Sequence, residues 1–186
     1  LIGFTDISGV VVLPLLAIQI LWLNLVTDGL PALALGVDPQ SPDIMERKPR
    51  FPSERIVSLN MVLNIIAIGV LVCVSSLVLF KIGLSYGTDV ARTMVFTGLV
   101  MMEFVRVYMI RSLYKIGVFS NLWLLIAMAV SFMLQLLVVY SPLQTVFKTA
   151  PLGVMQWMYL LFATVVVFAV GSVASKLIAF VTRERD

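Results

Sequence analysis

Residues 24–31 read NLVTDGLP and place an amide, a hydroxyl and a carboxylate inside an otherwise apolar segment. An ionisable group at bilayer depth costs at least about 2.5 kcal/mol and is a mark of an ion or substrate path. Gly29 and Pro31 come close behind Asp28, and both residue types weaken a helix. We therefore expect a spanning helix that is unwound near Asp28-Gly29-Leu30-Pro31. Its freed carbonyl oxygens and polar side chains suit a hard cation.

The composition is that of an integral membrane protein. The chain has 186 residues, of which 61% are hydrophobic and 12% charged, whereas soluble domains carry about 25% charged residues. The net charge of +3 comes from basic residues at segment ends, so the sequence gives no indication of nucleic-acid binding. The lack of histidine excludes a histidine-based metal site or triad within this chain, and the single Cys73 excludes an internal disulfide.

Five apolar segments have the length of about 20 residues that a helix needs to cross a bilayer. We therefore predict an all-α, polytopic transmembrane bundle over residues 12–186, with residues 1–11 as the end of a preceding helix and an outer loop. Since the chain begins at Leu1 without a basic and apolar leader, we expect it to be the C-terminal part of a longer protein. The predicted helices cover residues 12–36, 57–80, 91–110, 121–140 and 154–180.

The distribution of basic residues predicts the orientation. Loop 38–55, loop 111–120 and the C-terminal tail together hold nine lysines and arginines, whereas the opposite side holds three. The positive-inside rule therefore places loop 38–55 and the C-terminus in the cytoplasm, and we expect the protein in the cell membrane.

Candidate ligands lie on two predicted helices. Asn24, Thr27 and Asp28 are spaced i, i+3 and i+4, so they share one face and offer three kinds of oxygen to one ion. The alternative for Asn24 and Thr27 is hydrogen bonding to neighbouring helices. Glu103 is either a cation ligand or proton carrier that faces Asp28, or the partner of Arg106 in an internal ion pair.

Two further features limit the function. Asn60 and Asn64 are four residues apart and are expected to bond to a partner helix. The sequence contains no glycine-rich phosphate loop and no soluble stretch longer than about 20 residues. We therefore expect no catalytic residue within this chain, and no ATP hydrolysis by the chain alone.

The residues resemble those of a known family. Residues 19–36 (QILWLNLVTDGLPALALG) look like the sixth transmembrane helix of P-type calcium-transporting ATPases, and residues 43–50 (DIMERKPR) look like the loop after it. Residues 97–103 are similar to helix eight, and residues 140–157 to the connection from helix nine to helix ten. The resemblance covers nearly the whole chain, from the end of helix five through helix ten.

The resemblance implies roles for individual residues. Asn24 and Asp28 would ligate one calcium together with helix four, while Thr27, Asp28 and Glu103 would belong to a second site shared with helix five. Arg106 departs from the two-calcium pumps, where we align a neutral residue. Our hypothesis is therefore one calcium per cycle, with Arg106 filling the other position.

The resemblance also implies the wider setting. Loop 38–55 would contact the phosphorylation domain, and its coupling residues would be Asp38, Asp43, Glu46 and Arg47. Ca²⁺ would be the transported ion, with proton counter-transport, and Mg²⁺ and ATP would be bound by the missing soluble domains. The expected partners are the lipid bilayer and the remaining helices and cytoplasmic domains of the same pump.

Two other readings are open on the sequence alone. One is a P-type pump for another cation, such as Mn²⁺, Mg²⁺ or Na⁺, because oxygen ligands separate these ions poorly. The other is a non-catalytic membrane anchor or assembly domain.

Overall fold

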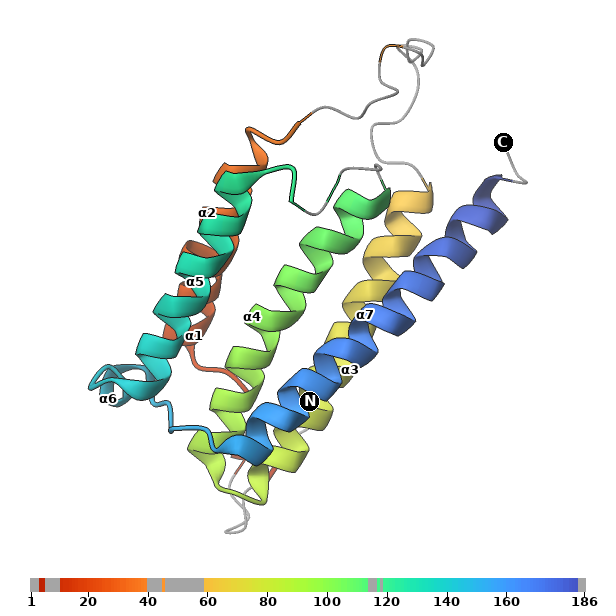
Figure 1. The fold of residues 1–186 in the computed structure, drawn as a ribbon. Helices are drawn as coiled ribbons and strands as arrows, with labels where there is room; N and C mark the ends of the chain where they lie inside the picture. The colour runs from red at the N-terminus through yellow and green to blue at the C-terminus, as the bar shows by residue number, and fades with distance from the viewer. Residues whose placement is uncertain are drawn as a thin grey trace.

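The computed structural model describes residues 4–5, 11–39, 45, 59–113, 117 and 119–183 (Figure 1). In this part of the chain, five helices are long and apolar enough to cross a membrane, which confirms the predicted all-α bundle. The first crosses as three consecutive pieces, followed by four continuous α-helices and one short one. The elements are α1 (Ala17–Trp22), η1 (Leu23–Asp28), α2 (Gly29–Leu35), α3 (Leu59–Leu84), α4 (Thr88–Leu113), α5 (Leu122–Tyr140), α6 (Gln144–Phe147) and α7 (Val154–Arg183).

The chain before the first helix is extended. β1 (Phe4–Thr5) pairs antiparallel with β2 (Val11–Val12). The three described residues of segment 1–11, which was predicted as the end of a preceding helix and an outer loop, therefore lie in short strands. The first helix starts at Ala17, a few residues after the approximate start that the sequence predicts. Leu16 has an extended backbone, with φ −95° and ψ 156°, and its N–H donates to Gln19 Oε1 at 3.0 Å.

Helices α3, α4 and α7 form a three-helix bundle (Figure 1) with an apolar core. Leu79, Met94, Leu160 and Val167 are buried together in this core. The turn between α3 and α4 is tight because Gly83 packs against the backbone of Ala91. A Cβ at position 83 would lie 2.5 Å from the Ala91 Cα, so only glycine fits.

The three-part helix α1–η1–α2 lies beside α5, with α4 between this pair and the other helices (Figure 1). Aromatic side chains fill the space near α6. Trp22 meets Phe147 edge to face with ring centroids 5.0 Å apart, and Phe96 stacks on the same ring at 6.5 Å.

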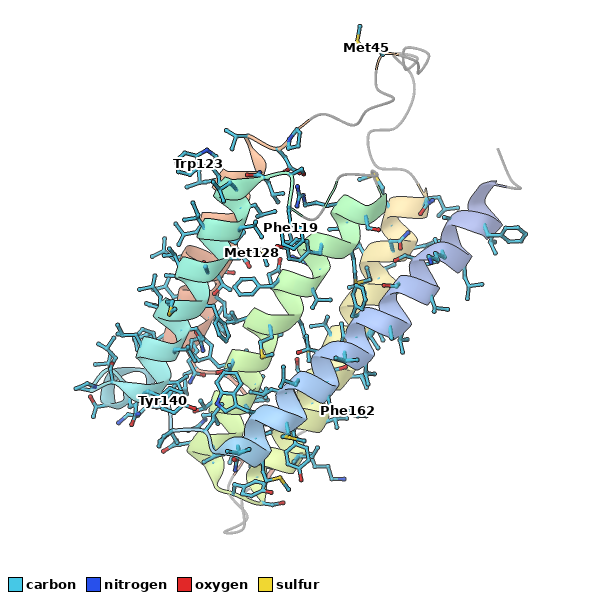
Figure 2. All side chains as sticks on the ribbon, in the orientation of Figure 1. Met45, Phe119, Trp123, Met128, Tyr140 and Phe162 are labelled. Carbon is cyan, nitrogen blue, oxygen red and sulfur yellow. The ribbon has the colours of Figure 1, made fainter. Side chains whose placement is uncertain are left out.

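The ends of the helices fall into two groups. The C-terminal ends of α2, α4 and α7 lie at the same end of the bundle as the starts of α3 and α5, and the α3–α4 turn and α6 lie at the other end (Figure 1). On α5, Trp123 and Tyr140 mark these two ends, and Phe162 points outward from α7 (Figure 2). This grouping is the one on which the predicted orientation depends, and the cytoplasmic assignment itself stays a prediction.

Candidate cation site

The first helix changes its geometry at the motif that opened the sequence. Residues Leu23–Asp28 are π-helical, and Gly29 continues in right-handed helical conformation with φ −64° and ψ −49°. The sequence predicts that the helix is unwound near Asp28-Gly29-Leu30-Pro31. In the structure the helix stays wound there and is widened just before Gly29 instead. Pro31 has no N–H to offer to the carbonyls four and five residues earlier, those of Thr27 and Val26.

A distant hydroxyl supplies one of the missing donors. Ser131 Oγ of α5 donates to the Val26 carbonyl at 3.0 Å. A π-helical segment is often found at a functional site because its extra residue re-aims the side chains around it. Here the widened segment is held in place by α5.

All five residues proposed for cation binding and its modulation line one cavity. It has a volume of about 810 Å³ and lies among η1, α3, α4 and α7. Thr27 is buried, at 2% exposure, whereas Asn24 and Asp28 are open to the cavity side of the helix. The five residues are Asn24, Thr27, Asp28, Glu103 and Arg106.

Glu103 and Arg106 form an ion pair on α4. Their side chains are 23% and 48% exposed, respectively. The pairing that the spacing allowed is therefore present, and both groups also line the cavity with Asp28. A guanidinium thus stands among two carboxylates, where it reduces their mutual repulsion and carries a fixed positive charge.

The far wall of the cavity carries polar side chains among apolar ones. Asn60 and Asn64 of α3 line it with Ser175 of α7. Asn64 Nδ2 donates to Asn60 Oδ1 at 2.6 Å and to the Asn60 carbonyl at 3.0 Å. The bond to a partner helix expected for these two asparagines is thus replaced by one within α3. Among the described residues, Asn64 Oδ1 and Ser175 Oγ are buried without a hydrogen-bond partner.

The donor set suits a hard cation but is small. Ca²⁺ takes six to eight oxygen ligands, and the four proposed side chains offer amide, hydroxyl and carboxylate oxygens. Among the residues that the structure describes, no group of three or more acidic, histidine or cysteine side chains is close enough to hold a metal. A Ca²⁺ ion bound here would therefore need further oxygen ligands from other parts of the protein or from water.

The proposed coupling loop lies mostly outside the described residues, including Asp43, Glu46 and Arg47. Asp38 is described, and its carboxylate is bound by a side chain of another helix. Arg111 of α4 binds both of its carboxylate oxygens, with Nε to Oδ2 and Nη2 to Oδ1 each at 3.0 Å. Sequence reasoning counted Arg111 only as a loop charge, since a partner 73 residues away gives no local signal.

Sequence reasoning also left Gln135 of α5 without a role. Its side chain is fully buried and joins three helices. Trp22 Nε1 donates to Gln135 Oε1 at 3.1 Å, and Gln135 Nε2 donates to Thr97 Oγ1 at 3.2 Å. Gln135 therefore joins α1 and α4 to α5 at the point where the π-helical segment begins.

Comparison with known proteins gives the family. Residues 12–177 match the family model described as cation transporting ATPase, C-terminus. The calcium-transporting ATPase of Bacillus subtilis (strain 168) is 39% identical over 157 residues, which is 78% of this chain and 17% of that protein. The calcium-transporting ATPase type 2C member 1 of Homo sapiens is 35% identical over 170 residues, or 88% of this chain and 18% of that protein.

A third relative agrees with these two. Calcium-transporting ATPase 1 of Schizosaccharomyces pombe (strain 972 / ATCC 24843) is 35% identical over 158 residues, which cover 81% of this chain and 18% of that protein. The chain thus spans less than a fifth of the length of these three relatives. It belongs to the P-type cation-transporting ATPases, and it corresponds to their C-terminal transmembrane region.

Proposed function

We propose that this chain is the cation-binding membrane part of an ATP-driven calcium pump, which holds Ca²⁺ between its helices and moves it out of the cytoplasm. The observation that carries the proposal is the gathering of an amide, a hydroxyl and two carboxylates around one cavity. Oxygen donors of these kinds are those that Ca²⁺ prefers. The three relatives that match over most of the chain are named as calcium-transporting ATPases. The proposed ligands are Asn24, Thr27, Asp28 and Glu103.

The energy for transport comes from the rest of the pump in this proposal. ATP and Mg²⁺ bind to soluble domains, and phosphorylation there shifts the helices around Asp28 between two arrangements. Loop 38–55 contacts the phosphorylation domain through Asp43, Glu46 and Arg47, whereas Asp38 stays bound to Arg111. The loop and the C-terminus face the cytoplasm, and the protein resides in the cell membrane.

Another helix of the pump completes the site in this proposal. Gly69 of α3 lines the cavity, and a Cβ at that position would meet nothing within 4 Å. The α3 wall is therefore open at Gly69, and we propose that the missing helix packs there. Such a helix would also offer partners to Asn64 Oδ1 and Ser175 Oγ.

We further propose that one calcium ion moves per cycle. Arg106 lines the cavity beside Glu103, and its fixed charge takes the place of a second cation. In this proposal the pump also counter-transports protons, which replace part of the charge that leaves the site with Ca²⁺.

The test is cation-dependent ATP hydrolysis by the full-length pump, purified in detergent and titrated separately with calcium, manganese, magnesium, sodium and potassium. We expect stimulation by micromolar calcium and its loss in Asp28→Asn. The matched control is Asp89→Asn, which changes an exposed carboxylate at the other end of α4. Stimulation by a different cation alone would keep the pump and change the ion, and no cation-dependent hydrolysis would support an anchor or assembly role.

The number of ions needs its own measurement. Radioactive calcium occluded per phosphorylated enzyme should equal one, and the same ratio should hold for calcium taken into vesicles per ATP hydrolysed. A ratio of two calcium ions per ATP would overturn the assigned role of Arg106.

A further inference from the structure

A buried polar cluster joins three helices at the end of the bundle where α2 stops. We call it the end clamp, and it consists of Asp38, Arg111, Ser120 and Asn121. The Arg111 side chain is 3% exposed and that of Asp38 is 14% exposed. Besides its two bonds to Asp38, Arg111 donates from Nη2 to Ser120 Oγ at 2.8 Å. A buried guanidinium that binds a carboxylate through two parallel bonds has a fixed geometry, unlike an exposed ion pair.

Asn121 brings α5 into the clamp. Its Nδ2 donates to the Ala34 carbonyl at 2.8 Å and to Asp38 Oδ1 at 2.9 Å. Its Oδ1 accepts from the Leu124 N–H at 3.0 Å and so caps the start of α5. One side chain thus satisfies a free carbonyl at the end of α2 and a free N–H at the start of α5.

A second cavity separates α2 from α4 between the cation site and the clamp. Its volume is about 300 Å³, and its lining includes Thr27, Asp28, Pro31, Glu103, Val107 and Arg111. Helices α2 and α4 run in the same direction (Figure 1). Residues that follow Asp28 and residues that follow Glu103 therefore both lie progressively further from the cation site and closer to the end clamp. From Asp28 to Leu35 the helix advances about 10 Å at 1.5 Å per residue.

Close packing between these helices is limited beside the cation site, where the cavity lies between them. Further along, Ala34 of α2 and Val107 of α4 belong to one apolar cluster that is completed by α5. The end clamp adds direct bonds between the two helices to this apolar packing. Cation ligands demand close control of the distance between helices, because a binding constellation must hold within about 0.5 Å of its working geometry.

We infer that the end clamp is a positioning device, which fixes α2 against α4 and thereby sets Thr27 and Asp28 at the distance from Glu103 that cation binding requires. The inference rests on the proposed function. Arg111 and Asp38 touch no cation in it, and they act through the two helices that carry the ligands.

The experiment measures equilibrium calcium binding and calcium-activated ATP hydrolysis of the full-length pump. Asp38→Asn removes the charge and keeps the shape, while Arg111→Lys keeps the charge and removes the planar fork. We expect the calcium concentration for half-saturation to rise about tenfold in Asp38→Asn, as is typical when residues that orient metal ligands are changed. The maximal hydrolysis rate and the calcium-independent phosphorylation by inorganic phosphate should stay close to those of the wild type.

Two comparisons make the result specific to the clamp. Asp89→Asn removes the exposed pair with Arg92 at the opposite end of α4 and should leave calcium affinity unchanged. The calcium affinity of the double variant Asp38→Asn/Arg111→Lys should be close to that of whichever single variant binds calcium more weakly. Both changes disrupt the same cluster, so their effects should not add. Should Asp38→Asn fail to fold, Arg111→Lys alone carries the measurement, with a smaller expected rise.

Unchanged half-saturation in a folded Asp38→Asn or Arg111→Lys pump would overturn the inference and leave the clamp a structural contact. Affinity losses that simply multiply in the double variant would also overturn it. Asp28→Asn, measured in parallel, separates the two proposals. If Asp28→Asn binds calcium normally, the proposed function fails. If Asp28→Asn loses calcium binding while the clamp variants bind calcium normally, only the inference about the end clamp fails.

Discussion

The bundle of α3, α4 and α7 and the pair formed by α1–η1–α2 with α5 are held together by different forces. The first packs through apolar side chains such as Leu79, Met94 and Leu160, which are buried without polar partners to satisfy. The second also has apolar contacts, such as those of Ala34 with Leu124, but it adds single hydrogen bonds to particular carbonyls and amides, such as that from Ser131 Oγ to the Val26 carbonyl. In an apolar interface the stabilisation is spread over many side chains, whereas a hydrogen-bonded interface can be altered by replacing a single donor or acceptor.

This difference assigns separate tasks to the two regions. The apolar bundle gives a stable frame on which Glu103 is carried. The hydrogen-bonded pair gives a helix whose local geometry departs from the α form at Thr27 and Asp28. Changes in the frame should therefore alter stability first, and changes in the pair should alter cation affinity.

Gly83→Val should have the largest effect on the frame. The new side chain would begin 2.5 Å from the Ala91 Cα, which cannot move without shifting α4. Overpacking of this kind costs about 3 kcal/mol, so the unfolding temperature of the purified pump without calcium should fall sharply. Val78→Leu, at an exposed site on the same helix, is the control. Equal unfolding temperatures for the two variants would contradict the close packing described here.

Gln135→Leu should have the next largest effect and should act on both regions. The change leaves Trp22 Nε1 and Thr97 Oγ1 without their present partner, at a cost of about 2 kcal/mol. We expect a lower unfolding temperature together with weaker calcium activation. Met133→Leu on the exposed face of α5 serves as the reference. A Gln135→Leu pump as stable as that reference would show that these bonds do not join the two regions.

Ser131→Ala should change affinity more than stability. The Val26 carbonyl loses its donor, which is worth about 1 kcal/mol, or about a fivefold rise in the calcium concentration for half-saturation. Ser131→Thr keeps the hydroxyl and should restore most of the affinity. If the alanine and threonine variants bind calcium alike, the hydrogen bond does not support the π-helical segment.

Asp89→Asn should have the smallest effect. Asp89 is 58% exposed and pairs with Arg92 at 3.3 Å, and exposed pairs of this kind contribute less than about 1 kcal/mol. Arg92 Nε also donates to the Leu13 carbonyl at 3.1 Å, a bond that the variant keeps. Neither the unfolding temperature nor calcium activation should shift measurably, and a clear shift in either would show that the frame depends on this turn.

The sequence predicts the five spanning helices well, because long apolar runs bounded by polar loops leave few alternatives. It predicts the position of the segment that departs from the α-helical form, but it predicts the wrong geometry for that segment. Gly29 and Pro31 indicate that the helix must depart from the α form nearby, but a local pattern does not say whether it unwinds or widens. The bond from Ser131, 105 residues away in sequence, favours the widened form.

The important residues of the candidate site and its surroundings also fall into two groups, those that the sequence indicates and those that it does not. Asn24, Asp28 and Glu103 stand out because polar groups are rare in apolar segments, and the structure brings them to one cavity. Arg111 and Gln135 have no local signature, since each is explained only by partners on other helices. Residues whose role lies in long-range pairing are the ones that reading along the chain misses.

The most direct test of the account is equilibrium binding of radioactive calcium to the full-length pump in the absence of ATP, with wild type, Asp28→Asn and Asp89→Asn measured side by side. We expect saturable binding at micromolar calcium in the wild type and in Asp89→Asn, and its loss in Asp28→Asn. Saturable binding of unchanged affinity in Asp28→Asn would contradict the claim that the π-helical segment holds the cation.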